Sequence, residues 1–306
     1  MWALGVTEAL RRPDLGALVL AAGAKAGTAF ESTWDAWTQR VFGEAMASPV
    51  AFPPEPPRWR MPEAGEERIH PVDGSVMVFV PGGVFLQGAD DANQAARPVH
   101  EVTLRPYWID KYPVTNSRYA RFLRANPSVQ RPEYWDNADF NGPEQPVVGV
   151  SWDEAMAYAM WAGLALPSEA QWEAAARGRD GRRYPWGNEP PDAQRANFGR
   201  EVGRTTPVGA YPAGAGPYGT LDQAGNVDEW CLDPWNARAY EARRPDLADP
   251  VAEGNTAGRA VRGGSWAGDP GFLAAAIRFG LGTGFRLQFQ GFRCVLSWSP
   301  PSTVGS

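Results

Sequence analysis

The strongest periodic patterns in the chain are two helical ones that begin at matching capping signals. Ser151 is followed by Glu154, and Ser168 by Gln171, and in each pair both side chains can bond backbone N–H groups of a first helical turn. Apolar residues follow both signals at spacings of three and four. The pattern predicts one helix after residue 151 and another after residue 168.

The chain before these helices is predicted to alternate strands and one more helix. Residues 75–89 hold two β-rich runs separated by residues 81–83, Pro-Gly-Gly, which predicts a hairpin. A further strand is expected through Val102–Leu104, and Thr115 or Asn116 is expected to cap a third helix.

The first 70 residues are expected to form a helical N-terminal extension that ends in a proline-rich linker. Apolar residues between positions 15 and 41 recur at helical spacing, and residues 49–67 are dense in proline, which predicts a stiff, extended connection. The main domain is then expected over residues 71–306. Residues 15–24 are apolar but too few to cross a membrane, so we expect a cytoplasmic protein without a membrane span.

The C-terminal stretch 262–296 differs from all of these segments. Its apolar residues stand beside glycines and show neither helical nor strand periodicity. Apolar groups without a periodic reason to be buried are candidates for an exposed patch, and such patches mark binding faces. We expect this stretch to carry the function.

Composition narrows the fold class and the partners. With 34 Gly and 29 Pro among 306 residues, short elements and many turns are expected, which favours an α+β fold with much irregular loop. The net charge is −6 and there is no basic run, so nucleic acid is not an expected partner. The two cysteines, Cys231 and Cys294, are interpreted as buried thiols, with a single bridge as the alternative.

Ordered motifs across residues 74–296 give the chain a specific resemblance. It is similar to the formylglycine-generating enzyme (sulfatase-modifying factor) family through these motifs: FVPGGVFLQGA, RPYWIDKYPVTNSRYARFL, QPVVGVSWDEAMAYAMWAG, LPSEAQWEAAARG, RYPWGNE, GNVDEW, RGGSW and GFRC. The resemblance implies a C-type lectin-like domain with small twisted sheets, two main helices and long loops.

The same resemblance argues against the chemistry of the family's enzymes. The catalytic members bind copper through a C-x4-C pair after RGGS, and those positions hold Gly268 and Leu273 here, which cannot ligate copper. A second enzymatic branch uses histidine-bound iron, but His70 and His100 are the only histidines. No catalytic residue and no cofactor is therefore expected, apart from structural calcium. The resemblance makes Asn197, Asn226 and Glu229 the candidate calcium ligands, with loop capping as the alternative.

The C-terminal stretch resembles a non-enzymatic branch, the variable proteins of diversity-generating retroelements. In that branch template adenines are randomised and framework residues are kept, as Trp266, Arg278, Arg286, Phe292 and Arg293 would be here. The resemblance implies a ligand-binding surface made of the variable positions Ala267, Gly268, Asp269, Phe272, Ile277, Phe279, Gly280, Leu281, Phe285, Leu287, Gln288, Phe289 and Gln290.

The genetic code offers a weak check on this assignment. All of these positions except Gln288 and Gln290 hold residues that an AAC codon reaches when its adenines are changed. The sequence thus favours a non-catalytic protein that presents a diversified surface to a protein or other macromolecular ligand. The alternatives are an oxidoreductase of the formylglycine-generating type and a catalytically inactive regulatory module whose N-terminal helices dock a partner.

Overall fold

The computed structural model describes residues 60–242, 247–254 and 256–299. Most of the expected N-terminal extension, residues 1–70, lies outside these residues. Within the described ranges, no helix is both long enough and apolar enough to cross a membrane.

Three small sheets form the β-structure. The first is antiparallel, and its strands in spatial order are β1 (Glu67–Ile69), β2 (Val76–Val80), β5 (Tyr107–Asp110) and β10 (Val295–Ser297). The second pairs β3 (Gly83–Gln87) with β4 (His100–Leu104). The third has the order β8 (Phe279–Gly282), β7 (Gly258–Arg262), β6 (Asp228–Pro234) and β9 (Gln290–Gly291). Strand β1 of the first sheet lies before residue 71, where the main domain was expected to begin.

The predicted hairpin between residues 75 and 89 is wrong in its pairing. Both strands exist, but β2 pairs with β1 and β5, whereas β3 pairs only with β4. The connecting glycines explain the change of sheet. A Cβ on Gly82 would lie 2.8 Å from the Leu104 carbonyl oxygen, and Gly83 has φ +133°, so the chain can pass from one sheet to the next only without side chains.

The predicted helix starts are confirmed. Helix α3 (Asn116–Ala125) is capped by Thr115, whose hydroxyl accepts the N–H of Arg118. Helices α4 (Trp152–Ala162) and α5 (Glu169–Arg177) both carry the predicted capping boxes. The described residues therefore contain the three expected α-helices, together with four short 3-10 helices.

Helix α5 lies at the centre of the molecule, and all nine of its residues are buried. Ala170, Ala174 and Ala175 pack on the first two sheets, and Trp172 and Ala176 pack against the third. Small side chains let the helix approach both layers closely. A separate aromatic core, which includes Tyr119, Phe122 and Tyr158, lies between α3, α4 and the first sheet.

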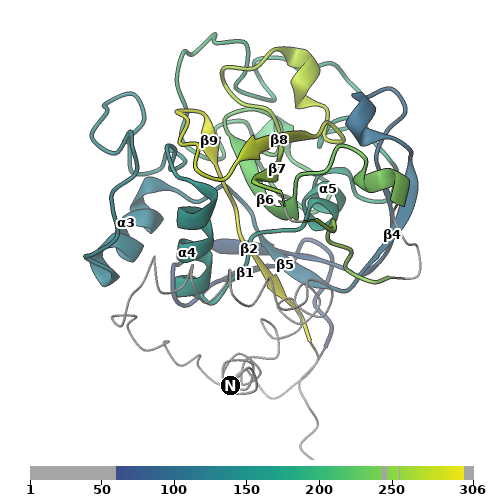
Figure 1. The fold of residues 1–306 in the computed structure, drawn as a ribbon, viewed down its shortest axis with the longest axis horizontal. Helices are drawn as coiled ribbons and strands as arrows, with labels where there is room; N and C mark the ends of the chain where they lie inside the picture. Colours follow the sequence, from purple (N-terminus) through teal and green to yellow (C-terminus); the bar gives the residue numbers. More distant parts are fainter. Residues whose placement is uncertain (1–59, 243–246, 255, 300–306) are drawn as a thin grey trace, which may run out of the picture.

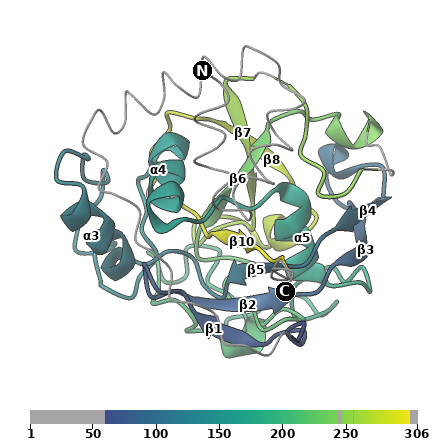
Figure 2. The same ribbon diagram turned by 90° about the horizontal axis from the view of Figure 1, so that it is seen from below.

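These elements separate two ends of the molecule. Figure 1 shows β1, β2 and β5 in the lower half, with α3 and α4 on one side, and the β6–β9 sheet with the yellow-green C-terminal loops in the upper half. Figure 2 shows α5 between the β5–β10 strands and the strands β6 to β8. The stretch 262–290 therefore lies at the end opposite the first sheet.

Candidate ligand-binding surface

The C-terminal stretch is anchored by arginines that are fully buried. Arg262, at the end of β7, donates to Glu173 and Glu169 of α5, to the Tyr240 hydroxyl and to the Ala275 carbonyl oxygen at 2.7 Å. Arg278 forms a two-pronged ion pair with the same Glu169. Both arginines are 0% exposed, so residues 262–278 are held against helix α5 by buried ion pairs as well as by apolar packing.

One of the carboxylate partners, Glu173, is held in its charged form. Burial alone would raise the pKa of Glu173, but the neighbouring guanidinium groups of Arg262 and Arg177 hold it below its ordinary value. A buried pair is costly to assemble, but it is strongly destabilising to break, because one charge is left without compensation. The network therefore fixes the position of this backbone.

A second buried pair holds the end of the stretch. Arg293 donates from Nε and a terminal nitrogen to the two oxygens of Glu229, both at 2.7 Å. Trp172 of α5 donates its indole N–H to the same carboxylate at 2.8 Å. Arg286 makes a similar two-pronged pair with Glu154, but its side chain is 34% exposed. The predicted framework residues thus have structural partners.

The backbone of the predicted variable positions is also held from below. The carbonyl oxygen of Gly268 accepts the N–H of Gly199 at 2.9 Å, that of Leu287 accepts the N–H of Gly149 at 3.0 Å, and that of Phe289 accepts the N–H of Asp228 at 2.8 Å. Trp266 is buried and donates its indole N–H to the Gln288 carbonyl oxygen at 3.3 Å. None of these bonds depends on the side chain of a variable position.

Eleven of the thirteen predicted variable positions are at least partly exposed. Four of them are exposed: Asp269, Phe272, Gly280 and Phe285. The half-buried ones are Ala267, Gly268, Phe279, Leu281, Leu287, Gln288 and Phe289. The stretch therefore presents a surface with large apolar side chains, among them Phe272 at 43% and Phe285 at 54% exposure.

Two of the thirteen positions lie in the interior of the structure. Ile277 is 8% exposed and packs in an apolar cluster with Leu273 and Tyr184. Gln290 is 1% exposed, and its amide donates to the backbone oxygen of Asp228 at 3.1 Å. Gln290 was also one of the two residues that an AAC codon cannot reach. We leave both residues out of the candidate surface.

Position 280 is exposed but has little room for a side chain. A Cβ on Gly280 would lie 2.1 Å from Cγ of Trp235, so any larger residue requires that indole to move. At Gly268, by contrast, a Cβ would meet its nearest neighbour at 3.5 Å, which is ordinary contact. Diversification at the two glycines therefore has different structural consequences.

One neighbour of this surface was missed by sequence reasoning. Residues 199 and 200 run beside it, with the Gly199 N–H donating to the Gly268 carbonyl oxygen at 2.9 Å and the Arg200 N–H donating to the Trp266 carbonyl oxygen at 2.8 Å. The sequence around Arg200, GREVGR, has no motif or periodicity that could have indicated this position. Only the fold brings it next to the stretch.

The candidate calcium ligands are largely occupied by other interactions. Both oxygens of Glu229 accept hydrogen bonds from Arg293, and Asn226 Oδ1 accepts from Asn197 and from the Thr206 N–H at 2.9 Å. Asn197 Oδ1 is buried without a hydrogen-bond partner, but calcium takes about six to eight oxygen ligands. In this arrangement the contacts of Asn226 and Glu229 match the loop-capping alternative, and calcium at this place stays a prediction. Among the described residues, no group of three or more His, Cys, Asp or Glu could hold a metal ion.

The cysteines are free and buried, and they lie in different apolar clusters. Burial raises the pKa of Cys231 and of Cys294 well above the ordinary range, so both are thiols rather than thiolates at neutral pH. At the positions of the enzymes' copper ligands, Gly268 has no side chain and Leu273 is 0% exposed.

The chain aligns with several curated proteins. Serine/threonine-protein kinase Pkn1 of Chlamydia trachomatis is 34% identical over 298 residues, which are 91% of this chain and 48% of that protein. Hercynine oxygenase of Mycolicibacterium smegmatis is 35% identical and covers 66% of this chain and 56% of that protein. Formylglycine-generating enzyme of Streptomyces coelicolor is 38% identical, over 62% of this chain and 78% of that protein. The chain thus spans about half the length of the first two relatives.

Solved structures share the fold. PvdO from Pseudomonas aeruginosa superposes with a TM-score of 0.68 at 27% identity, over 78% of this chain and 100% of that one. Treponema denticola variable protein 1 superposes with a TM-score of 0.63 at 22% identity, over 76% and 98%, which shows a common fold. The sequence profile of the sulfatase-modifying factor enzyme 1-like domain matches residues 63–298. This match covers most of the chain, which therefore belongs to the sulfatase-modifying factor enzyme 1-like family and has its α+β, C-type lectin-like fold.

Proposed function

We propose that this protein is a non-catalytic ligand-binding protein that presents a retroelement-diversified surface on its C-type lectin-like scaffold. The ligand is a protein or another macromolecule, and it contacts the exposed variable positions between residues 267 and 289. The proposal rests on one observation above all. Framework side chains of the stretch are tied into the core, whereas most positions predicted to vary point outward from a backbone that core segments hold.

The chemistry of the exposed positions suits macromolecular contact. Phe272 and Phe279 pack edge to face with ring centroids 5.3 Å apart, and Phe285 lies exposed next to β8. Aromatic side chains supply a large contact area at a low cost in side-chain entropy, and they anchor many protein interfaces. A pre-positioned aromatic pair is therefore a good core for a binding patch.

We infer the absence of copper-dependent catalysis from the number and position of the cysteine thiols. Copper chemistry of the formylglycine-generating type needs two accessible thiolates close together, and the candidate positions hold Gly268 and Leu273. The two cysteines that the chain does possess are buried thiols in separate clusters. Neither can replace a missing ligand without rearrangement of the core.

The direct test is a comparison of the gene with its neighbouring DNA. We expect a near-copy of codons 262–296 that differs almost only where the copy has adenine, next to a reverse transcriptase gene. The differences should fall on the exposed positions and spare Ile277 and Gln290. A genome with neither the copy nor the reverse transcriptase would remove the retroelement part of the proposal.

The second candidate is an oxidoreductase of the formylglycine-generating type, favoured by the 38% identity to the Streptomyces coelicolor enzyme. Purified protein would be incubated with copper, a thiol and a cysteine-containing peptide, and both oxygen uptake and aldehyde formation would be measured. We expect neither. Stoichiometric copper binding with turnover that is lost in Cys231→Ala or Cys294→Ala would favour the enzyme instead.

A further inference from the structure

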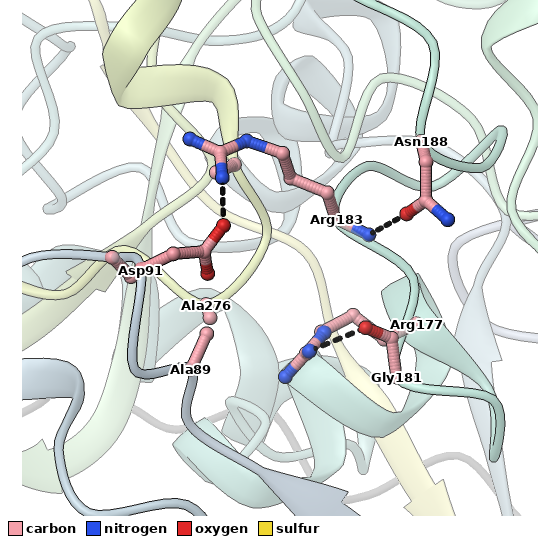
Figure 3. A pocket seen from close by; sticks show the side chains of 9 residues that line it. Ala89, Asp91, Arg177, Gly181, Arg183, Asn188 and Ala276 are labelled. Atoms are coloured by element: carbon pink, nitrogen blue, oxygen red, sulfur yellow. Dashed lines mark hydrogen bonds and ion pairs between the residues drawn. The ribbon is translucent and has the colours of Figure 1, made fainter.

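A cavity of about 280 Å³ lies outside the candidate binding surface (Figure 3). Its walls come from residues 89–92 after β3, from the end of α5 with the loop 181–188, and from the segment 274–276. None of the lining residues is among the thirteen predicted variable positions. Any ligand of this cavity would therefore be the same in all diversified versions of the protein.

One side of the cavity is apolar and consists of residues that are not predicted to vary. It is formed by four alanines, of which Ala274 and Ala276 are buried parts of the framework and Ala89 and Ala92 are half-buried. Arg177 also lines the cavity, but it is fully engaged. It donates to Glu173 and to the carbonyl oxygens of Gly88 and Gly181, each at 2.7 Å. Its charge is compensated within the protein and is not available to a ligand.

The other side carries one accessible pair of opposite charges. Arg183 and Asp91 form an ion pair that joins two different loops, and their side chains are 39% and 67% exposed. Figure 3 shows the Arg183 guanidinium directed at the Asp91 carboxylate. The backbone of Arg183 is fixed, because its N–H donates to Asn188 Oδ1 and its carbonyl oxygen accepts the N–H of Ala275, both at 2.9 Å.

An exposed ion pair of this kind contributes little to stability, so a ligand can separate it at low cost. A ligand that offers both a carboxylate and an ammonium group would replace the pair with two charge-assisted hydrogen bonds. The volume lies near the lower end of the roughly 300–1,000 Å³ that small-molecule sites occupy, and the alanine wall leaves room for a short apolar group.

We propose that the cavity binds a small zwitterion, a free α-amino acid with a short apolar side chain. The ligand carboxylate accepts hydrogen bonds from Arg183, the ammonium group donates to Asp91, and the side chain lies against the alanines. This site is independent of the proposed function at the diversified surface, because it uses other residues and another class of ligand.

Calorimetry on the full chain tests the proposal with alanine and valine as ligands, and with propionate, propylamine and a methyl glucoside as comparisons. We expect saturable binding of the amino acids at millimolar concentration or below. The compounds with a single charge, and the sugar, should bind at least about tenfold more weakly. Absence of saturable amino-acid binding, or equal binding of propionate, propylamine or the sugar, would overturn the proposal.

Matched variants locate the binding. Arg183→Gln and Asp91→Asn should each weaken amino-acid binding at least about tenfold, and Ala89→Leu should weaken it by filling the cavity without a change of charge. The control is Arg195→Gln, which removes a partly exposed pair with Asp192 elsewhere on the molecule and should leave binding unchanged. Equal affinity in all four variants would place the ligand at another site. Circular dichroism and the melting temperature identify any variant that does not fold.

Discussion

Three arginines and two phenylalanines exchange the usual environments of their residue types along residues 262–293. Arg262, Arg278 and Arg293 are 0% exposed, whereas Phe272 and Phe285 are 43% and 54% exposed. The usual preference is the opposite, with phenylalanine inside and arginine at the surface. Residue type alone therefore does not tell which side chains of this stretch are structural.

The partners explain the exchange. Each buried arginine faces a carboxylate of the scaffold: Glu169 and Glu173 on α5, and Glu229 on β6. The exposed phenylalanines have no equivalent place in the core. Such a division gives the fold a rigid set of directional contacts and leaves the outward side chains free to change. Four substitutions test this division, in order of decreasing effect.

Glu229→Gln should have the largest effect. It leaves the Arg293 guanidinium buried beside a neutral amide, and loss of one partner of a buried pair costs about 3–5 kcal/mol of unfolding free energy. Denaturant unfolding measures the loss. Arg286→Gln is the matched control, since the pair with Glu154 is partly exposed and should cost about 1 kcal/mol or less. Equal losses would show that burial does not distinguish the two pairs.

Asp222→Asn tests the scaffold by its pH dependence. Burial raises the pKa of Asp222 from 3.8 to about 6, although the Gly209 N–H and Arg293 act in the opposite direction. Between about pH 4 and pH 6 the Asp222 carboxyl therefore keeps its proton in the folded state, whereas it has lost it in the unfolded state. The free energy of unfolding should fall by up to about 3 kcal/mol as the pH rises through this range.

An asparagine at position 222 removes this loss, keeps an oxygen for the Gly209 N–H and suits the local φ of 58°. The variant should equal the wild type near pH 3.5 and exceed its stability at pH 7. Melting temperatures across this range measure the difference. Asp269→Asn, on the exposed surface, is the matched control, and an effect of equal size there would contradict the account.

Gly280→Ala should be destabilising by about 1–3 kcal/mol, because the added methyl group meets the Trp235 ring. Gly268→Ala should change stability by about 0.5 kcal/mol or less, since its surroundings leave room. Thermal unfolding of the two variants, together with Trp fluorescence as a report on Trp235, decides the case. If the two alanines cost the same, position 280 is as free to vary as position 268.

Phe285→Ser should have the smallest effect on folding, within about 0.5 kcal/mol, because the side chain is 54% exposed. Its expected consequence is on ligand binding, where the loss of an aromatic contact is large. Once a ligand has been selected, its affinity can be measured beside the melting temperature. A clear loss of stability would place Phe285 in the core rather than in the binding patch.

Local sequence signals predicted local structure well. The capping residues Thr115, Ser151 and Ser168 mark the three helix starts, since a cap is decided by residues within one turn. The prediction that β2 pairs with β3 was wrong, because a strand pattern does not indicate which sheet a strand joins. The sequence also predicted that Arg278, Arg286 and Arg293 belong to the framework of the stretch.

Their partners could not be read from the sequence, because long-range contacts decide them. Glu154 has the pattern of a capping residue, and it is one, yet the same carboxylate also pairs with Arg286. Ile277 looked equivalent to its neighbours along the stretch, and it lies inside because it packs against Leu273 and Tyr184. Gln290 lies inside because strand β9 pairs with β6. Gly199 and Arg200 contact the stretch from a distant loop without any local signal.

The central claim is that the outward positions tolerate change while the framework does not, and two displayed libraries compare them directly. One library randomises Asp269, Phe272, Phe285, Leu287 and Gln288. The other randomises Arg262, Trp266, Arg278, Phe292 and Arg293. After protease challenge, we expect most members of the first library and very few of the second to survive as folded protein. Equal losses from the two libraries would contradict the account.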